Sequence, residues 1–297
     1  MSDHPSSASS QKILLVKLSS LGDVLHNLPI VWDLRARFPN AQIDWVVEEA
    51  YVHLLQPLLS RDGFKGIDRI IPFGLRRWKK SLFKLNSWKQ FFSFKKELQA
   101  VSYDVIIETQ GLLKSALVCA LAKKSSDAVV AGLANATEYS GYEPISRMFY
   151  NQCVQVPFQC HAIDRSRYVM CSALDLPLIS RAESTQFYLS DHLLKLASQG
   201  VSNLNKPYVL FFHSTARDAK RWSNTNWVAL GKLLAERGYQ IVLPWGSAAE
   251  KNISEELAAQ IPGSIVPKAF SMEEAFVIVA HAELVIGVDT GLTHLAA

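Results

Sequence analysis

The chain has 297 residues, a net charge of +4, 49% apolar and 20% charged residues, which is the composition of an ordinary globular protein of about two domains. A chain of this length buries sizeable cores without disulfides or structural metals, and no apolar run reaches the roughly 18–20 residues that cross a bilayer. The four cysteines show no metal-ligand spacing, so we expect reduced thiols in a cytoplasmic protein.

Strands alternate with helices in the prediction for the first half of the chain. A polar segment, 1–11, lacks an apolar signal core and is expected to be a disordered leader. The apolar run at 12–18 is typical of a buried parallel strand, and the apolar-periodic helix after it contains Pro29, which predicts a kink or a new first turn. Further strands are predicted at 42–47, 69–73, 104–108 and 128–132, and further helices at 112–122 and 163–174.

The second half of the chain repeats this pattern after a polar stretch at 198–206. Strands are predicted at 208–213, 240–244 and 284–288, and helices at 226–237, at 250–260, after a capping box formed by Ser271 and Glu274, and from Thr290 onward. Such alternation is typical of parallel sheets with right-handed crossovers. We therefore expect an α/β protein whose two Rossmann-like lobes, 12–185 and 186–297, face a cleft. The chain stops inside an apparent helix, so we expect the second lobe to be truncated.

The loop after the first strand, Ser19-Ser20-Leu21-Gly22-Asp23, contains the first candidate for chemistry. Doubly wound sheets bind ligands at the carboxyl ends of their strands, where this loop lies. Asp23 is then either a cap of the helix N-terminus, a place that suits Asp, or a general base that faces the cleft. Neither a G-x-G-x-x-G nor a P-loop motif is present, which removes the main support for a dinucleotide or P-loop site.

Two loops of the second lobe offer donors for a diphosphate. The segment HSTARDAKRW (213–222) follows a strand and contains hydroxyls and cations, and GVDTGLTH (287–294) turns tightly into a helix N-terminus. Backbone N–H groups at such a terminus bind phosphate. Each loop alone could also be a solvated loop or a capped helix start. Together they favour a nucleotide-diphosphate site.

A basic segment, 76–96, contains eight Lys or Arg residues, six aromatic residues and no acid. One interpretation is a solvated helix face, a second is a surface for phosphorylated lipid head groups, and a third is a site for single-stranded nucleic acid. The modest net charge argues against nucleic acid as the main partner. We therefore expect an anionic membrane surface as the partner, and no nucleic acid.

These motifs resemble those of the inverting ADP-heptose:lipopolysaccharide heptosyltransferases. The resemblance runs from about Lys12 to the last residue, and DWVVEE (44–49), RRWKK (76–80) and VDTGLTH (288–294) are closer to type I of the family than to type II. The other matching segments are VKLSSLGDVLH (16–26), QGLLKSAL (110–117), HAIDRSR (161–167), HSTARDAKRW (213–222) and LPWGSAAE (243–250).

The resemblance implies a glycosyltransferase-B fold and an inverting transfer of heptose from ADP-heptose to the Kdo sugar of Kdo-lipid A in the lipopolysaccharide inner core. It implies that the acceptor binds the first lobe and the nucleotide sugar the second, with Asp23 as the catalytic base. ADP-heptose is then a substrate, and neither a cofactor nor a metal is required. The implied donor-binding residues are Thr215, Lys220, Glu250, Asp289, Thr290, Gly291 and His294, and the implied acceptor-binding residues are Ser19, Ser20, Arg76, Arg77, Lys79, Lys80 and Lys114.

Two residues depart from the family pattern. Ala216 stands where a second Thr is common, and Tyr142 stands where Arg is expected, which affects a hydroxyl at the donor and a contact to the acceptor. The resemblance also implies a cytoplasmic protein that is peripheral on the inner membrane. The alternatives are heptosyltransferase II, another nucleotide-sugar transferase of the same fold and, in a different class, a non-catalytic nucleotide-sugar-binding protein.

Overall fold

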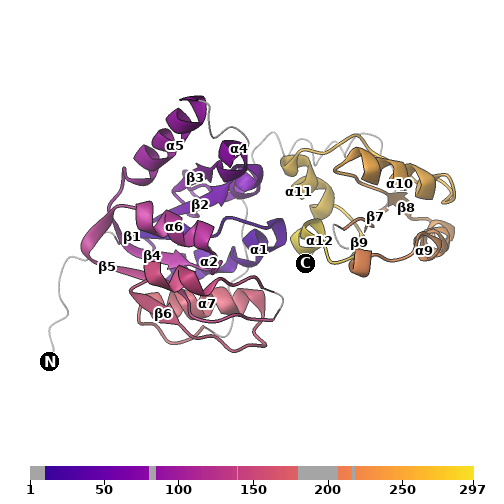
Figure 1. The fold of residues 1–297 in the computed structure, drawn as a ribbon. Coiled ribbons are helices and arrows are strands. Elements are labelled where there is room, and N and C mark those ends of the chain that lie inside the picture. The colour runs from indigo at the N-terminus through magenta and orange to yellow at the C-terminus, as the bar shows by residue number, and fades with distance from the viewer. Residues whose placement is uncertain (1–10, 80–84, 139, 180–206, 216–217) are drawn as a thin grey trace. The chain divides into compact units, whose positions relative to one another are not determined.

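The computed structural model describes residues 11–79, 85–138, 140–179, 207–215 and 218–297. These residues form two compact units, one within 1–188 and one within 189–297, and each unit has its own parallel sheet (Figure 1). The predicted α/β class with parallel sheets is therefore confirmed. The expected lobe boundary at 185/186, residues 1–10 of the expected leader, Lys80 and Ala216 lie outside the described residues.

The first unit is built on a six-stranded parallel sheet with the strand order β3-β2-β1-β4-β5-β6. Successive strands add outward from β1 on one side and then outward from β4 on the other. The direction of winding therefore reverses between β1 and β4, and a doubly wound sheet binds ligands at such a switch point. The strands are β1 (Lys12–Val16), β2 (Gln42–Glu48), β3 (Arg69–Phe73), β4 (Tyr103–Glu108), β5 (Lys124–Leu133) and β6 (Gln152–Val154).

Helices cover both faces of this sheet. Pro29 begins a separate helix after a short first one, because its missing N–H group and fixed φ suit the first turn of a helix. Arg167 Nε of α7 lies 2.9 Å from Asp33 Oδ2 of α2, and this buried ion pair joins the two helices. The helices are α1 (Leu21–His26), α2 (Pro29–Arg37), α3 (Val52–Leu55), α4 (Leu75–Lys79), α5 (Leu85–Leu98), α6 (Leu113–Leu121) and α7 (Ala162–Ala173), with the 3-10 turns η1 (Glu49–Tyr51), η2 (Gln56–Leu58) and η3 (Pro144–Phe149).

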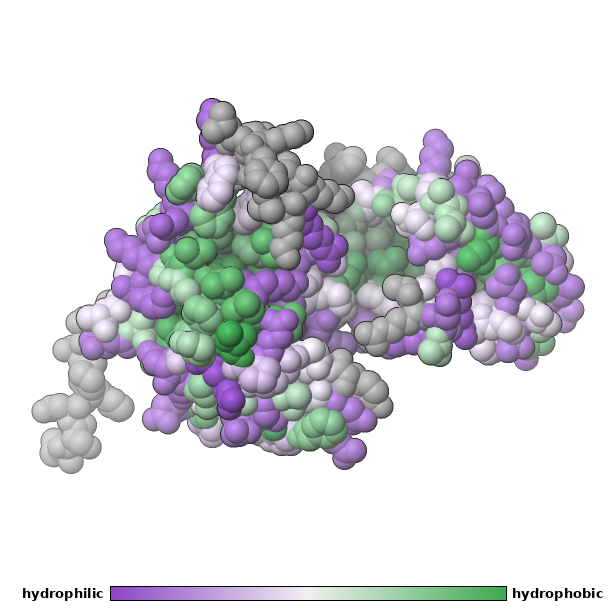
Figure 2. Space-filling model, in the orientation of Figure 1, coloured by the Kyte–Doolittle hydropathy of each residue, from purple (hydrophilic) through white to green (hydrophobic). Residues whose placement is uncertain are grey.

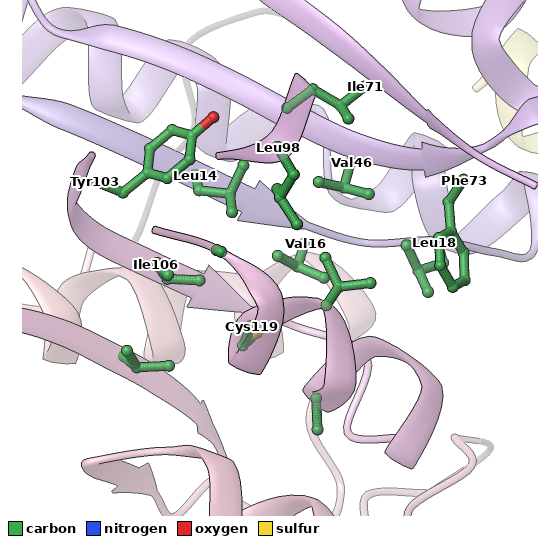
Figure 3. Packing of buried hydrophobic residues seen from close by; sticks show 14 of the residues in the cluster. Leu14, Val16, Leu18, Val46, Ile71, Phe73, Leu98, Tyr103, Ile106 and Cys119 are labelled. Carbon is green, nitrogen blue, oxygen red and sulfur yellow. The ribbon is translucent and has the colours of Figure 1, made fainter. Parts of the chain in front are cut away.

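The hydrophobic core on one side of this sheet lies under α5 and α6 (Figure 3). Leu14 and Val16 of β1 point into it, because alternate residues of a strand share a face. Leu98 of α5 and Cys119 of α6 pack against them. Ile13 and Leu15 are also fully buried, so β1 is covered on both faces. This double burial explains why the strand is a continuous apolar run.

The second unit contains a three-stranded parallel sheet with the order β8-β7-β9. The winding reverses between β7 and β9, which is the switch point of this sheet. The predicted capping box is confirmed, because Ser271 N donates to Glu274 Oε2 at 2.7 Å and Glu274 N donates to Ser271 Oγ at 3.2 Å. The elements are β7 (Tyr208–Phe212), η4 (Asp218–Lys220), α9 (Asn224–Glu236), β8 (Gln240–Val242), α10 (Ala248–Ala258), α11 (Met272–Ala280), β9 (Leu284–Gly287) and α12 (Gly291–Ala296).

Candidate active site

Asp23 lies in the first turn of α1, directly after the carboxyl end of β1 and at the switch point of the first sheet. Its Oδ2 accepts hydrogen bonds from Ser20 N at 3.1 Å and from Ser20 Oγ at 2.8 Å. Asp23 therefore helps to fix the start of the helix, as a capping residue does. Its side chain nevertheless remains 38% exposed. The capping role and a role toward a ligand are thus compatible in this geometry.

Two buried cations lie beside the other oxygen of Asp23. Lys17 Nζ is 3.7 Å and Arg165 Nη2 is 3.6 Å from Asp23 Oδ1. Burial opposes ionisation of Asp23, but Lys17, the hydrogen bonds from Ser20 and Arg165 outweigh it and hold the pKa of the carboxyl below its ordinary value. Asp23 is therefore a carboxylate at neutral pH, the form that accepts a proton. Neither cation is predicted from the sequence as a site residue, and the only signal for them is their place in the segments 16–26 and 161–167.

Lys17, the residue that follows β1, is a buried lysine at the carboxyl edge of the sheet. Its Nζ donates a hydrogen bond to the carbonyl oxygen of Thr109 at 3.2 Å. Burial lowers the pKa of Lys17 to about 8, in spite of the attraction of Asp23. The ammonium therefore persists at neutral pH and is lost under mildly alkaline conditions.

Gln110 fixes the backbone that precedes Asp23. Its Oε1 accepts from Leu18 N at 2.8 Å, and its Nε2 donates to the carbonyl oxygen of Ser19 at 2.9 Å. Gln110 follows β4, so these bonds join the loops after β1 and β4 at the switch point. The buried Glu108 holds this second loop in turn, because its Oε1 accepts from Gln110 N at 2.8 Å. The position of Asp23 is thus set by two neighbouring strands.

Glu48, at the end of β2, gathers two of the expected acceptor cations. Lys114 Nζ donates to Glu48 Oε1 at 2.8 Å, and Arg76 Nε lies 2.9 Å from Glu48 Oε2. Lys114 Nζ also donates to Ser19 Oγ at 2.7 Å, which connects this cluster to the loop of Asp23. The structure therefore brings Ser19, Lys114 and Arg76 together around one buried carboxylate.

The remaining acceptor residues are less closely gathered. Arg77 pairs with Glu49 rather than with Glu48. Ser20 is exposed beside Asp23, Lys79 belongs to α4, and Lys80 lies outside the described residues. The segment 76–96 contains no acid, but the fold brings Glu48 and Glu49 to its first two arginines. A local count of charge could not reveal these partners.

The aromatic residues of the segment 76–96 have two different environments. Trp78 and Phe94 are buried in the core of the first unit, at 6% and 4% exposure. Trp88 and Phe92 are exposed. The buried pair holds α4 and α5 on the sheet, and Phe83 of the same segment lies outside the described residues.

Tyr142, where the family resemblance predicts Arg, anchors a loop. Its hydroxyl donates to the carbonyl oxygen of Ala134 at 2.7 Å. Its ring lies against Gly111, where an added Cβ would be 3.1 Å from Tyr142 Cδ2. Tyr142 therefore supplies packing at this place and no positive charge.

In the second unit, the loops after β7 and β9 meet around Asp289. Thr215 Oγ1 donates to the carbonyl oxygen of Asp289 at 3.3 Å, and Lys220 forms an ion pair with the Asp289 carboxylate. His294 Nε2 lies 3.0 Å from Asp289 Oδ1. The bond from Lys220, and secondarily that from His294, lower the pKa of Asp289 against the effect of burial. The structure thus brings these four predicted residues together.

Thr290 and Gly291 begin α12 at the same switch point. Thr290 is the N-cap residue, and its carbonyl oxygen accepts from Thr293 N at 3.1 Å and from His294 N at 3.2 Å. Gly287, at the end of β9, permits close packing there, because an added Cβ would lie 2.1 Å from Thr293 Oγ1. The first turn of α12 is therefore pressed against the end of β9.

Glu250 and the buried His213 complete the ends of β7 and β8. Glu250 Oε2 accepts from Gly246 N at 2.7 Å in the loop after β8. His213 Nε2 forms a 2.8 Å hydrogen bond with Ser254 Oγ, and burial lowers the pKa of His213. This histidine is therefore neutral at pH 7 and supports the loop without adding charge. Neither His213 nor Ser254 is predicted from the sequence as a site residue.

The described ranges contain no cluster of three or more His, Cys, Asp or Glu side chains arranged to hold a metal ion. In the same part of the chain, no helix combines the length and the apolar character needed to span a bilayer.

Comparison with known proteins identifies the family. The family model described as glycosyltransferase family 9 (heptosyltransferase) matches residues 91–297. The chain belongs to glycosyltransferase family 9. It is therefore a glycosyltransferase, and the resemblance noted from its motifs is confirmed.

Similar proteins extend this family 9 assignment over nearly the whole chain. Lipopolysaccharide heptosyltransferase 1 of Pseudomonas aeruginosa is 36% identical over 96% of this chain and 75% of its own length. The same enzyme of Escherichia coli K12 is 34% identical over 96% of this chain and 84% of its own length. A structure titled E. coli heptosyltransferase WaaC with ADP has a TM-score of 0.79 and 32% identity, and the match covers 96% of this chain and 84% of that one. The expected glycosyltransferase-B fold is confirmed by this likeness.

Proposed function

We propose that this family 9 glycosyltransferase moves heptose from ADP-heptose to a Kdo hydroxyl of Kdo-lipid A, in the inner core of lipopolysaccharide. The similar proteins are named lipopolysaccharide heptosyltransferase 1, and one related E. coli structure was solved with ADP-2-deoxy-2-fluoro heptose. The observation that carries the proposal is the ionised, partly exposed Asp23, held at a switch point between two buried cations.

Asp23 is the general base of the proposed reaction. The Kdo hydroxyl oxygen forms a bond to the anomeric carbon of heptose on the face opposite ADP. The bond from that carbon to the diphosphate breaks, ADP leaves, and the configuration is inverted. The hydroxyl proton passes to Asp23, and general-base help of this kind is worth roughly 10²–10⁴-fold in rate.

The second unit is the proposed site of the nucleotide sugar. Lys220 and the backbone N–H groups at the start of α12 are assigned to the diphosphate, because an ammonium and a helix N-terminus both favour anions. Electrostatic stabilisation of a leaving group is often the largest catalytic contribution. Thr215, Glu250, Asp289, Thr290, Gly291 and His294 are the other proposed donor residues. Since protein groups supply the positive charge, we propose that no divalent metal is required.

The first unit is the proposed site of the acceptor lipid. Ser19, Ser20, Arg76, Arg77, Lys79, Lys80 and Lys114 are assigned to its phosphates and carboxylates. The charge cluster around Glu48 supports this, because Arg76 remains 69% exposed while its Nε is held by the carboxylate. We place the enzyme in the cytoplasm, peripheral on the inner membrane, where such a lipid is reached.

One assay tests this proposal. The chain is incubated with ADP-heptose and Kdo-lipid A in excess EDTA, and the acceptor is examined by mass spectrometry. We expect the mass gain of one heptose, with no gain from GDP-mannose as a control donor. Binding of ADP-heptose without transfer would favour the non-catalytic alternative. Loss of transfer in EDTA and recovery with Mg²⁺ would contradict the metal-free mechanism alone. Transfer only to an acceptor that already carries heptose would indicate a type II enzyme.

A further inference from the structure

An apolar groove of about 860 Å³ runs between α5 and α6 of the first unit. Phe73 and Trp78 lie at its base, and Trp88, Phe91 and Leu117 line its walls. Trp88 is 55% exposed and Leu117 is 45% exposed. Figure 2 shows hydrophobic residues gathered on the surface over α6. Exposed apolar residues that gather around a groove commonly mark a place where another molecule binds.

The groove is preformed because its base belongs to the core. Trp78 packs edge to face on Phe91, with ring centroids 5.7 Å apart, and lies 5.5 Å from Phe94. These contacts fix α4 and α5 on the sheet, so the walls are held without a ligand. A preformed apolar groove of a few hundred Å³ or more is typical of sites for apolar ligands.

One end of the groove is continuous with the candidate active site and adjoins the cluster of Lys114, Arg76 and Glu48, in which two cations share one carboxylate. Lys114 lines the groove and donates to Ser19 Oγ at 2.7 Å, in the loop that holds Asp23. The described residues that line the groove include one acidic residue, Glu143. Its Oε2 accepts a hydrogen bond from Leu113 N at 2.6 Å. Lys89, which follows the groove residue Trp88 on α5, is exposed and adds positive charge. The groove therefore complements a molecule that has an anionic head and an apolar tail.

We propose that this groove holds one acyl chain of the acceptor lipid while its saccharide lies beside Asp23. The proposal rests on the function proposed above. A saccharide close to the bilayer surface reaches Asp23 more easily when the lipid is partly lifted from the membrane. Lifting exposes methylenes to water, at about a fourfold cost in equilibrium for each one. The groove removes that cost by covering the chain, and Lys114 meets the anionic head at its end.

The test compares an acylated with a deacylated acceptor. The double variant Trp88→Gln and Leu117→Gln makes the walls polar at exposed positions and should keep the fold, which circular dichroism checks. We expect KM for Kdo-lipid A to rise about tenfold. This is the effect of exposing fewer than two methylenes of the acyl chain to water. KM for the fully deacylated saccharide should stay within about twofold of wild type. The matched control is Leu233→Gln, because Leu233 of α9 is also 45% exposed and lies outside the groove. Equal effects on the two acceptors, or no effect on either, would overturn the proposal.

A second readout does not depend on transfer. Kdo-lipid A with a diazirine at the end of one acyl chain is irradiated with the protein in the absence of ADP-heptose, and the labelled peptides are mapped. We expect labels on α5 and α6, which the double variant loses. Labels elsewhere would contradict the groove as the chain site. Equally strong labelling of the groove by diazirine-bearing phosphatidylglycerol in vesicles would make it a general bilayer contact instead. Groove labelling by a protein that fails the transfer assay would keep the groove as an acyl-chain site for Kdo-lipid A and refute the proposed function.

Discussion

The two carboxylate oxygens of Asp23 have different partners. Oδ2 is occupied by Ser20, while Oδ1 lies between Lys17 and Arg165. This arrangement keeps the carboxylate in place and charged without removing it from solvent. A base held ionised in this way has a low intrinsic basicity, so its contribution must come from its position relative to the acceptor hydroxyl.

Replacing Asp23 by Asn separates its charge from its structural role. The Asn side-chain oxygen can still accept from Ser20, but Lys17 and Arg165 lose their carboxylate partner, so we expect the variant to fold with a lower thermal stability than wild type. Turnover should fall by about 100-fold or more, because the base is lost. Donor affinity, measured by calorimetry, should be little changed. Asp127→Asn, at an exposed position of β5, is the control. Wild-type turnover of Asp23→Asn would remove this residue from the mechanism.

Because of Lys17, the free energy of unfolding should change with pH in the alkaline range. In the unfolded chain its pKa is near 10.5, and in the folded chain it is about 8. Between these values the unfolded state binds more protons, so this group makes folding more favourable as pH rises. In denaturant unfolding, wild type should therefore gain roughly 3 kcal/mol relative to Lys17→Met between about pH 8 and 10.5. A difference between the two proteins that does not change over this range would show that Lys17 is not desolvated.

At the scale of elements, both sheets place their candidate residues at a switch point. Gln110 joins the loops after β1 and β4, and the contacts of Asp289 join those after β7 and β9. In each unit, two loops far apart in sequence are neighbours because their strands are neighbours. The rule that ligands bind at these edges therefore applies to each unit separately.

Gly287→Ala tests the packing of α12 on β9. The added Cβ would lie 2.1 Å from Thr293 Oγ1 and 3.1 Å from Phe212 Cβ, so the first turn of α12 must shift. We expect a loss of roughly 1–3 kcal/mol in stability and weaker binding of ADP, because Thr290 and Gly291 move with that turn. The control is Gly141→Ala, whose Cβ would meet Leu112 Cδ2 at an ordinary 3.5 Å. Unchanged ADP affinity in Gly287→Ala would argue against a phosphate site at this turn.

Much of the element order could be predicted, because the parallel strands are apolar runs buried on both faces. The strand at 69–73 was predicted with its observed bounds, and Pro29 marked the start of α2. The strand β6 was missed because three residues, Gln152–Val154, are too few to show a period. The start of α9 was placed two residues late, although Ser223 caps it by accepting from Asn226 N.

The candidate site was only partly predictable for a different reason. The loops that contain Asp23 and Asp289 follow apolar runs directly, so the parallel-sheet rule predicts both loops at strand ends. Lys17 lies near the end of such a run, and a lysine there shows no local pattern that predicts burial. Arg165 and Glu48 acquire their roles from partners far away in the chain. Tertiary pairs of this kind leave no trace in local spacing.

At the scale of the whole molecule, the distribution of charge matters more than its sum. The net charge is only +4, yet Arg76 and Arg77 are 69% and 52% exposed on one helix of the first unit. Surface cations attract an anionic bilayer over about a Debye length, and salt screens that attraction.

The double variant Arg76→Glu and Arg77→Glu tests this attraction. Each new carboxylate would also face Glu48 or Glu49. We expect weaker sedimentation with phosphatidylglycerol vesicles and a smaller effect of added salt than in wild type. Lys232→Glu with Arg237→Glu, at exposed positions of the second unit, makes the same change in net charge. If both double variants lose equal affinity, net charge rather than this surface governs the binding.

The carboxylate of Glu48 also determines how a polyanion meets the protein. One of its oxygens pairs with Lys114 of α6 and the other with Arg76 of α4. The distance between the two oxygens of this carboxylate therefore sets the spacing of the two cationic groups. Side chains that are already restricted by an ion pair lose less further freedom when a ligand arrives. A ligand with two negative groups at the matching separation would therefore be preferred over two separate anions of equal total charge.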